Sequence, residues 1–240
     1  MSTPGSYLLC GTPRTGSTLL CSLLTSTGVA GRPESYFREP DQHMWAERFG
    51  VPVADDGSFD HRAFAAGALR AGTTPNGVFA ARIMWGTMDL IIDGLDPARR
   101  SRRDLDVLVR GFGPLHLVHL HREDVVGQAV SWARAEQTGY WQHGDVPSGE
   151  PQLDLDRISA LVSTIHDHNA AWNSWFTAQG ADPLVVTYEH LVADPGHAVR
   201  RILGVLGVAP QPGWRPASSH RRQADEVSAD WVRRYHAAYG

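Results

Sequence analysis

The sequence predicts an α/β fold in which a parallel β-sheet is flanked by helices. Short apolar runs near residues 8, 80, 118 and 185 are expected to be buried strands, and each is followed by a helical pattern. A glycine-rich loop separates the first strand from the first helix, an arrangement that directs free backbone N–H groups toward an anion. No linker or internal repeat divides the 240 residues, so residues 1–240 are expected to form one domain.

The first strand and helix lie close to the N-terminus. Residues 7–10 are apolar, as in a buried strand, and leucines at helical spacing predict a helix from Ser17 that ends before Gly28. Cys10 and Cys21 fall on these two elements. Because two cysteines make neither a disulfide framework nor a metal-ligand pattern, we expect both to be small buried side chains.

The later elements follow from the same periodicities. Further strands are expected at 78–84, 114–121 and 183–187, and helices at 86–92, 124–137, 153–179, 198–206 and 228–239. The stretch from 49 to 71 is weakly helical. Residues 139–152 form a long Gly- and Pro-containing loop with a Tyr-Trp pair, which is typical of a lid or a substrate wall rather than a linker.

The loop after the first strand carries the clearest chemical signal. Gly11 and Gly16 are five residues apart and Thr18 follows, which is the phosphate-loop pattern with Ser17 in the place of lysine. The whole chain contains no lysine, and all 22 basic side chains are arginine, with Arg14 inside the loop. We therefore expect an anion to be held by backbone amides, two hydroxyls and one guanidinium, which argues against a kinase or an ATPase. A purely structural glycine turn is the alternative.

Composition narrows the classes of partner. The net charge is −4, so no concentrated basic face for nucleic acid is expected and an anionic ligand must be held locally. The N-terminus lacks a charged region followed by an apolar run, and no segment approaches the ~20 apolar residues of a membrane helix. The expectation is a cytoplasmic protein without membrane insertion.

Four stretches, taken together, resemble one family. They are G-T-P-R-T-G-S-T-L at 11–19, G-V-A-G-R-P-E-S-Y-F at 28–37, H-R-E-D-V-V-G-Q-A-V-S-W at 121–132 and R-Q-A-D-x-x-S-x-x-W-V-x-R-Y at 222–235. The chain resembles the bacterial trehalose 2-sulfotransferase family, whose members use 3′-phosphoadenosine 5′-phosphosulfate (PAPS) as sulfuryl donor. The resemblance implies a P-loop-like sulfotransferase fold, no metal, a small-molecule hydroxyl acceptor such as a carbohydrate or glycosylated metabolite, and a homodimer.

The resemblance also implies the residues that bind the donor. It places the 5′-phosphosulfate on the loop after the first strand, the 3′-phosphate at a strand end and on the next helix, and a C-terminal motif over the nucleotide. The corresponding residues here are Arg14, Thr15, Gly16, Ser17 and Thr18, then Arg122 and Ser131, then Arg222 and Gln223. For the last two, a structural ion pair with Asp225 is the alternative.

The acceptor side departs from the family pattern. In the trehalose enzyme the catalytic base is a glutamate directly before two aromatics, whereas here Ser35 directly precedes them and Glu34 stands one residue earlier. We expect Glu34 to serve as base or in substrate binding, with Glu39, His119 or His121 as alternative bases. The acceptor-site insert is expected at about 32–74, and the substrate-binding residues are expected to be Glu34, Tyr36, Phe37, Arg82 and Trp141.

Two functions of other classes stay open at this point. One is a nucleotide kinase or another NTP-using enzyme on the same loop, against which the missing lysine and the lack of a clear magnesium-binding aspartate both speak. The other is a nucleotide-binding module without catalytic activity.

Overall fold

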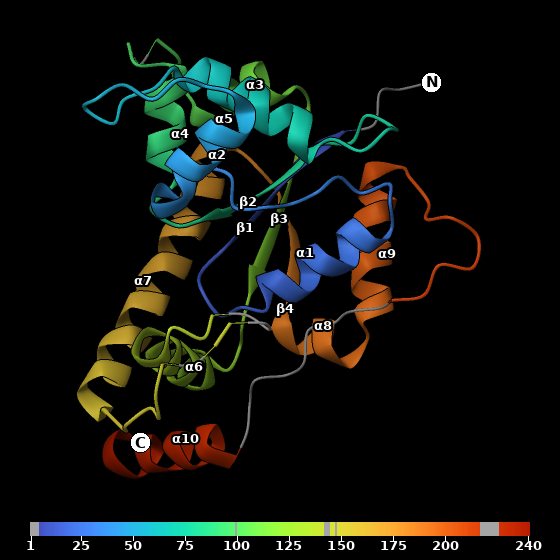
Figure 1. The fold of residues 1–240 in the computed structure, drawn as a ribbon. Coiled ribbons are helices and arrows are strands. Elements are labelled where there is room, and N and C mark those ends of the chain that lie inside the picture. The colour runs from blue at the N-terminus through green and yellow to red at the C-terminus, as the bar shows by residue number, and fades with distance from the viewer. Residues whose placement is uncertain (1–4, 99, 142–144, 147, 217–225) are drawn as a thin grey trace.

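The computed structural model describes residues 5–98, 100–141, 145–146, 148–216 and 226–240. A four-stranded parallel sheet lies at its centre, in the order β2-β1-β3-β4 (Figure 1). The strands are β1 (Ser6–Gly11), β2 (Ala80–Met84), β3 (Leu115–His121) and β4 (Leu184–Thr187). The predicted parallel α/β fold is confirmed, and all six residues of β1 are buried between its two neighbours.

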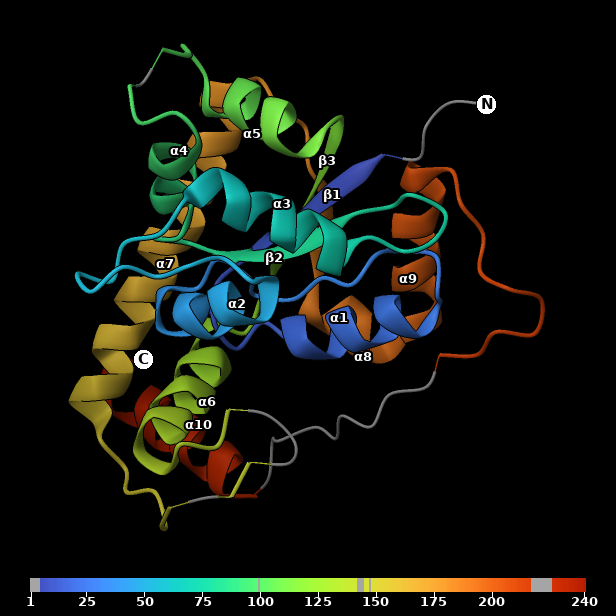
Figure 2. The ribbon, with the colours of Figure 1, turned by 45° about the horizontal axis from the view of Figure 1, so that its top comes forward.

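Helices cover both faces of the sheet because alternate side chains of each strand point to opposite faces. Tyr7 and Leu9 of β1 pack in one cluster, with α1 (Ser17–Ser26), α8 (Tyr188–Ala193) and α9 (Pro195–Leu206). Leu8 and Cys10 pack in the other cluster, with α3 (His61–Gly72), α4 (Met88–Leu95), α5 (Asp104–Phe112) and α7 (Leu155–Gln179). Figure 2 shows these two helical layers on either side of the strands.

A third cluster lies beyond the carboxyl end of the sheet. It joins α6 (Val125–Thr138) to α7 and to α10 (Glu226–Tyr239), which crosses beneath α6 in Figure 1. Val130 of α6 and Ile158 of α7 are fully buried there, and Trp231 of α10 is buried beside them. Although α7 is 25 residues long, neither it nor any other helix in the described ranges is long and apolar enough to cross a membrane.

Several short helices were not predicted as separate elements. The region at 32–74 contains the 3-10 helix η1 (Glu39–Asp41), α2 (Gln42–Phe49) and α3, whose N-terminus is capped by the Asp60 carboxylate. The predicted helix at 86–92 begins and ends later, as α4, while α5 and α8 have no counterpart among the predicted helices. Because α8 follows β4 without an intervening loop, no turn residue marks its start.

Both outer strands are covered along part of their free edge. Beside β2, the isolated bridge between Glu34 and Ala81 brings the Glu34 carbonyl to 2.9 Å from the backbone N–H of Arg82. Beside β4, the guanidinium of Arg201 donates to the carbonyl of Val185 at 3.1 Å. The first contact also fixes the segment that precedes Ser35 against the sheet.

Candidate functional site

The predicted anion loop lies at the carboxyl end of β1, where Gly11 pairs with β2 on one side and β3 on the other. Gly16, at the N-cap of α1, has a φ of 79°, and a Cβ there would lie 2.7 Å from the ring of Tyr188. Only glycine fits this position without displacing that ring. The N–H of Leu20 donates to the Gly16 carbonyl at 3.1 Å. The earlier N–H groups of α1 therefore lie at the positive end of the helix, available to an anion.

Arg14 brings the loop together with two other predicted site residues. Its Nε donates to the Ser131 hydroxyl of α6 at 3.0 Å, and its Nη1 donates to the carbonyl of Trp141 at 2.5 Å. The guanidinium also lies 6.0 Å from the centroid of the Trp141 ring. The loop, α6 and the start of the predicted lid thus meet at one side chain.

Arg122 is the second arginine of this group. It donates from Nη2 to the Asp124 carboxylate at 2.9 Å and lies over the ring of Tyr188, 4.6 Å from its centroid. Its Nε is buried and has no hydrogen-bond partner. Burial, and then the nearby charge of Arg122, lower the pKa of Arg14 to about 10. A bound anion would relieve the repulsion between these two cations.

Arg82 supplies a third guanidinium, at a place that the sequence analysis did not anticipate. Its Nη1 donates to the Thr18 hydroxyl at 2.9 Å and to the Ser17 hydroxyl at 3.4 Å, and its Nε donates to the Ser35 hydroxyl at 2.7 Å. It has no ion pair among the described residues. A cation from β2 therefore lies beside α1, where the phosphate-loop lysine is missing. The expected role of Arg82 in acceptor binding stays a prediction.

Of the residues expected to bind the acceptor, Glu34 lies at the surface, whereas Tyr36 and Phe37 lie in the core. Glu34 is exposed, and its carboxylate has no hydrogen-bond or ion-pair partner in the described part of the chain. Tyr36 is buried and donates from its hydroxyl to the Arg32 carbonyl at 2.7 Å. Phe37 is buried as well, edge-on to Phe64. As packed here, neither ring reaches an open surface, so direct contact of the two aromatics with an acceptor has no support in this arrangement.

The alternative bases differ in environment. His119 and His121 lie side by side on β3, with ring centroids 5.5 Å apart. The ring of His119 packs against Phe176 of α7 at 5.2 Å, and burial lowers its pKa to about 4. Glu39 is exposed in η1. Because His119 is buried among aromatic rings, an acceptor hydroxyl reaches it less readily than it reaches the exposed carboxylates of Glu34 and Glu39.

The sequence analysis did not assign four residues that the structure places at the site. Ser35 and Tyr188 touch the arginines, and Gln128 and Trp172 hold the loop from α6 and α7. The sequence gives a weak signal for the first two, since Ser35 directly precedes the aromatic pair and Tyr188 follows a strand end. Gln128 and Trp172 give no such signal, because their contacts with the loop join residues far apart in the sequence.

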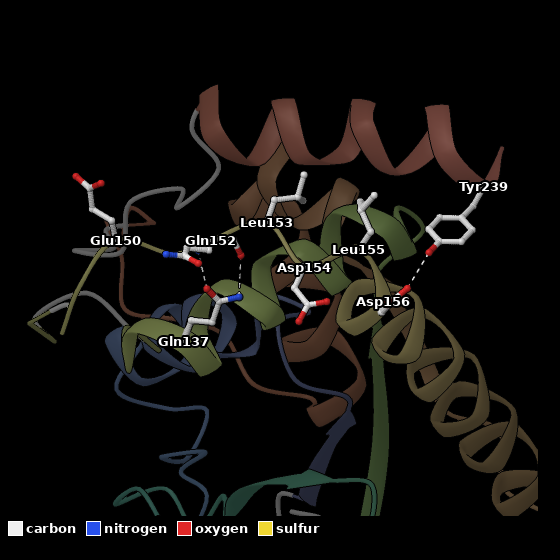
Figure 3. A pocket seen from close by; sticks show the side chains of 8 residues that line it. All are labelled: Gln137, Glu150, Gln152, Leu153, Asp154, Leu155, Asp156 and Tyr239. Atoms are coloured by element: carbon white, nitrogen blue, oxygen red, sulfur yellow. Dashed lines mark hydrogen bonds between the residues drawn. The ribbon is translucent and has the colours of Figure 1, made fainter.

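A hollow in the described part of the chain lies elsewhere, between the C-terminal end of α6, the start of α7 and the end of α10 (Figure 3). Three of its lining residues are acidic and none is basic: Glu150, Asp154 and Asp156. It is therefore unsuited to an anionic donor. Arg222 and Gln223 lie outside the described residues, and within the described ranges no three His, Cys, Asp or Glu side chains gather as a metal site.

Comparison with known proteins gives the family of the chain. The family model described as Stf0 sulphotransferase matches residues 6–238. The chain belongs to the Stf0 sulphotransferase family. Two curated relatives of this sulphotransferase are trehalose 2-sulfotransferases. The one from Mycolicibacterium smegmatis is 31% identical over 97% of this chain and 94% of the relative. The one from Mycobacterium tuberculosis is 32% identical over 96% of this chain and 94% of the relative.

One solved structure supports the fold. The sulfotransferase domain from the curacin biosynthetic pathway superposes with a TM-score of 0.54 at 14% identity, over 94% of this chain and 82% of that domain. The predicted sulfotransferase family and its P-loop-like α/β fold are confirmed.

Proposed function

We propose that this sulphotransferase transfers a sulfuryl group from PAPS to a hydroxyl of a small carbohydrate or glycosylated metabolite. The observation that carries the proposal is the convergence of three guanidinium groups, those of Arg14, Arg82 and Arg122, on the N-terminal end of α1. A bound anion would stabilise this group of cations at a positive helix end, and PAPS carries charged groups at both its 3′ and 5′ positions.

The arrangement fits a donor with two anionic ends. The end of α1, with the hydroxyls of Ser17 and Thr18 and the guanidinium of Arg82, suits the 5′-phosphosulfate. Arg122, whose Nε is buried and has no partner, suits the 3′-phosphate together with Ser131. Arginine is apt for both groups because its planar fork bonds phosphate or sulfate oxygens in pairs.

The chemistry assigns separate tasks to the two sides of the site. Sulfuryl transfer breaks the bond between sulfur and the bridging phosphate oxygen and forms a bond to the acceptor oxygen, which loses its proton. Arg14 and the positive end of α1 stabilise the charge that grows on the departing phosphate, as in phosphoryl transfer. Glu34 is the base that we propose for the acceptor proton, since its carboxylate is exposed and its backbone is fixed beside Arg82.

The acceptor class rests on the relatives. Both curated proteins of similar length act on trehalose by name, which favours a carbohydrate hydroxyl for this chain. Trp141, which is exposed and lies beside Arg14, offers an aromatic face of the kind that sugar rings pack against. The segment at 32–74 supplies the neighbouring wall in this proposal.

Donor binding can be tested with the product nucleotide. Adenosine 3′,5′-bisphosphate is expected to raise the melting temperature, whereas AMP, which lacks the 3′-phosphate, is expected to raise it far less. Arg14→Ala should abolish sulfate transfer to a sugar panel followed by mass spectrometry. Arg157→Ala, which removes an exposed arginine paired with Glu136, is the matched control and should leave transfer unchanged.

Two results would overturn the assignment of residues to the donor site, and a third would overturn the proposed activity. Equal thermal shifts with the bisphosphate and AMP would remove the 3′-phosphate site at Arg122 and Ser131. Retention of most transfer activity in Arg14→Ala would remove the role of that arginine at the leaving group. Magnesium-dependent ATP turnover would instead indicate an NTP-using enzyme.

A further inference from the structure

The side chain of Gln128 connects α6 to the backbone of the anion loop. This glutamine is fully buried, and its Nε2 donates to the Thr12 hydroxyl at 2.8 Å and to the Pro13 carbonyl at 2.7 Å. Both amide hydrogens are thereby used. Since the Pro13 carbonyl can only accept, the orientation of the amide is fixed, and Oε1 is left buried without a partner.

This contact determines the direction of the next peptide group. In a trans peptide the C=O and the following N–H point in opposite directions within one plane. No cis peptide occurs in the described ranges, so the Pro13 carbonyl held toward α6 turns the N–H of Arg14 away from α6. Arg14 then continues with a φ of 68°, a left-handed conformation that a side chain bearing a Cβ rarely adopts.

A second contact with the same helix holds the other end of Arg14. Ser131 lies three residues after Gln128, and its hydroxyl accepts from Arg14 Nε at 3.0 Å. Residues three apart share one face of a helix. One face of α6 therefore binds both the peptide that precedes Arg14 and the guanidinium of Arg14 itself.

We propose that Gln128 is a positioning residue that keeps Arg14 in its left-handed conformation and so directs its guanidinium into the donor site. It acts through the backbone at Pro13 and Arg14 and does not touch the donor. Its effect on ligand binding depends on the PAPS site proposed above, whereas its effect on the loop does not.

The binding test compares the same substitution at two places on α6. Gln128→Met keeps the length of the side chain but removes both donors, and we expect it to weaken binding of adenosine 3′,5′-bisphosphate about tenfold in calorimetry. Gln137→Met, which removes two hydrogen bonds with Gln152 at the C-terminal end of α6, is the control and should bind as the unmodified chain does. Gln128→His, which can still donate one hydrogen bond, should recover part of the affinity.

A double variant tests whether the effect passes through Arg14. If Gln128 acts by orienting Arg14, adding Gln128→Met to Arg14→Ala should weaken binding by less than twofold beyond Arg14→Ala alone. An unchanged tenfold loss in the Arg14→Ala background would overturn the proposal, because Gln128 would then act by another route.

Hydrogen exchange of the ligand-free protein gives a readout that needs no donor. Gln128→Met should raise exchange of the amides between Thr12 and Gly16, and Gln137→Met should not. Unchanged exchange in Gln128→Met would refute the positioning role. If the unmodified chain does not bind the bisphosphate, the proposed donor fails, while the exchange result still decides the role of Gln128. Should Gln128→Met not fold, Gln128→Asn takes its place, since it keeps the amide but withdraws it from Pro13.

Discussion

Trp172→Phe tests how the core of the fold supports the loop. Trp172 is fully buried on α7, stacks on Phe176 with ring centroids 5.5 Å apart, and donates from its indole N–H to the carbonyl of Gly11 at 2.9 Å. That carbonyl also accepts from the backbone N–H of Trp85 at 3.2 Å. Phenylalanine keeps the stacking but removes the indole N–H and part of the ring volume.

The expected loss of stability has two parts. Because Gly11 keeps its bond from Trp85, its carbonyl is not left without a partner, and the lost hydrogen bond costs about 1 kcal/mol. The void beside Phe176 adds about 1 kcal/mol. The free energy of unfolding should therefore fall by about 2 kcal/mol, or roughly 4–8 °C in melting temperature for a chain of this size.

The measurement is urea unfolding followed by circular dichroism, combined with calorimetric binding of adenosine 3′,5′-bisphosphate. Trp175→Phe is the control, since it removes an indole bond of equal length, 2.9 Å, from the same helix to Asp104. Both variants should lose similar stability, but only Trp172→Phe should weaken nucleotide binding, by a few-fold. Equal binding losses in the two variants, or no loss of stability in Trp172→Phe, would refute this account of the loop.

Two further predictions concern charged and titratable groups. Arg82→Lys keeps the charge but replaces the planar fork, whose Nε and Nη1 bond Ser35 and Thr18 separately, with a single nitrogen. We therefore expect kcat/KM for sulfate transfer to fall about tenfold, and unchanged kinetics would contradict the need for the fork. Burial lowers the pKa of His119 to about 4, below its value of 6.5 in the unfolded chain. Its contribution to stability is therefore complete above pH 6.5 and is lost as the pH falls toward 4, by up to about 3 kcal/mol. His119→Leu should flatten that part of the pH profile of urea unfolding, and an unaltered profile would show that other groups cause it.

The parts of the fold that could be predicted are those with a local cause. The first strand, the loop and α1 follow from an apolar run, two glycines and a leucine repeat, and the structure has them as β1, residues 11–16 and α1. The strand order could not be predicted, because sequence periodicity does not say which strands are neighbours. Tyr36 and Phe37 show the corresponding limit, since a motif places them near the site but not on its surface.

The site likewise contains residues that local motifs predicted and residues that only the fold brings to it. Arg14, Ser131 and Trp141 were predicted from separate motifs, and the structure brings them into contact. Gln128 and Arg82 reach the loop through contacts that span more than sixty residues, so no local pattern could place them there. The sequence indicates one cation within the loop, Arg14, and the structure adds a second beside α1, Arg82 from the neighbouring strand.

The covered edges of the sheet limit how copies of this chain can associate. An open outer strand exposes unpaired N–H and C=O groups and can recruit a strand from another molecule, which is a common route to aggregation. Here the backbone N–H of Arg82 is already bonded to Glu34, and the carbonyl of Val185 to Arg201. The free edges of β2 and β4 are therefore poor templates for strand addition. At either position, addition of a strand from another copy would first require one of these hydrogen bonds to break.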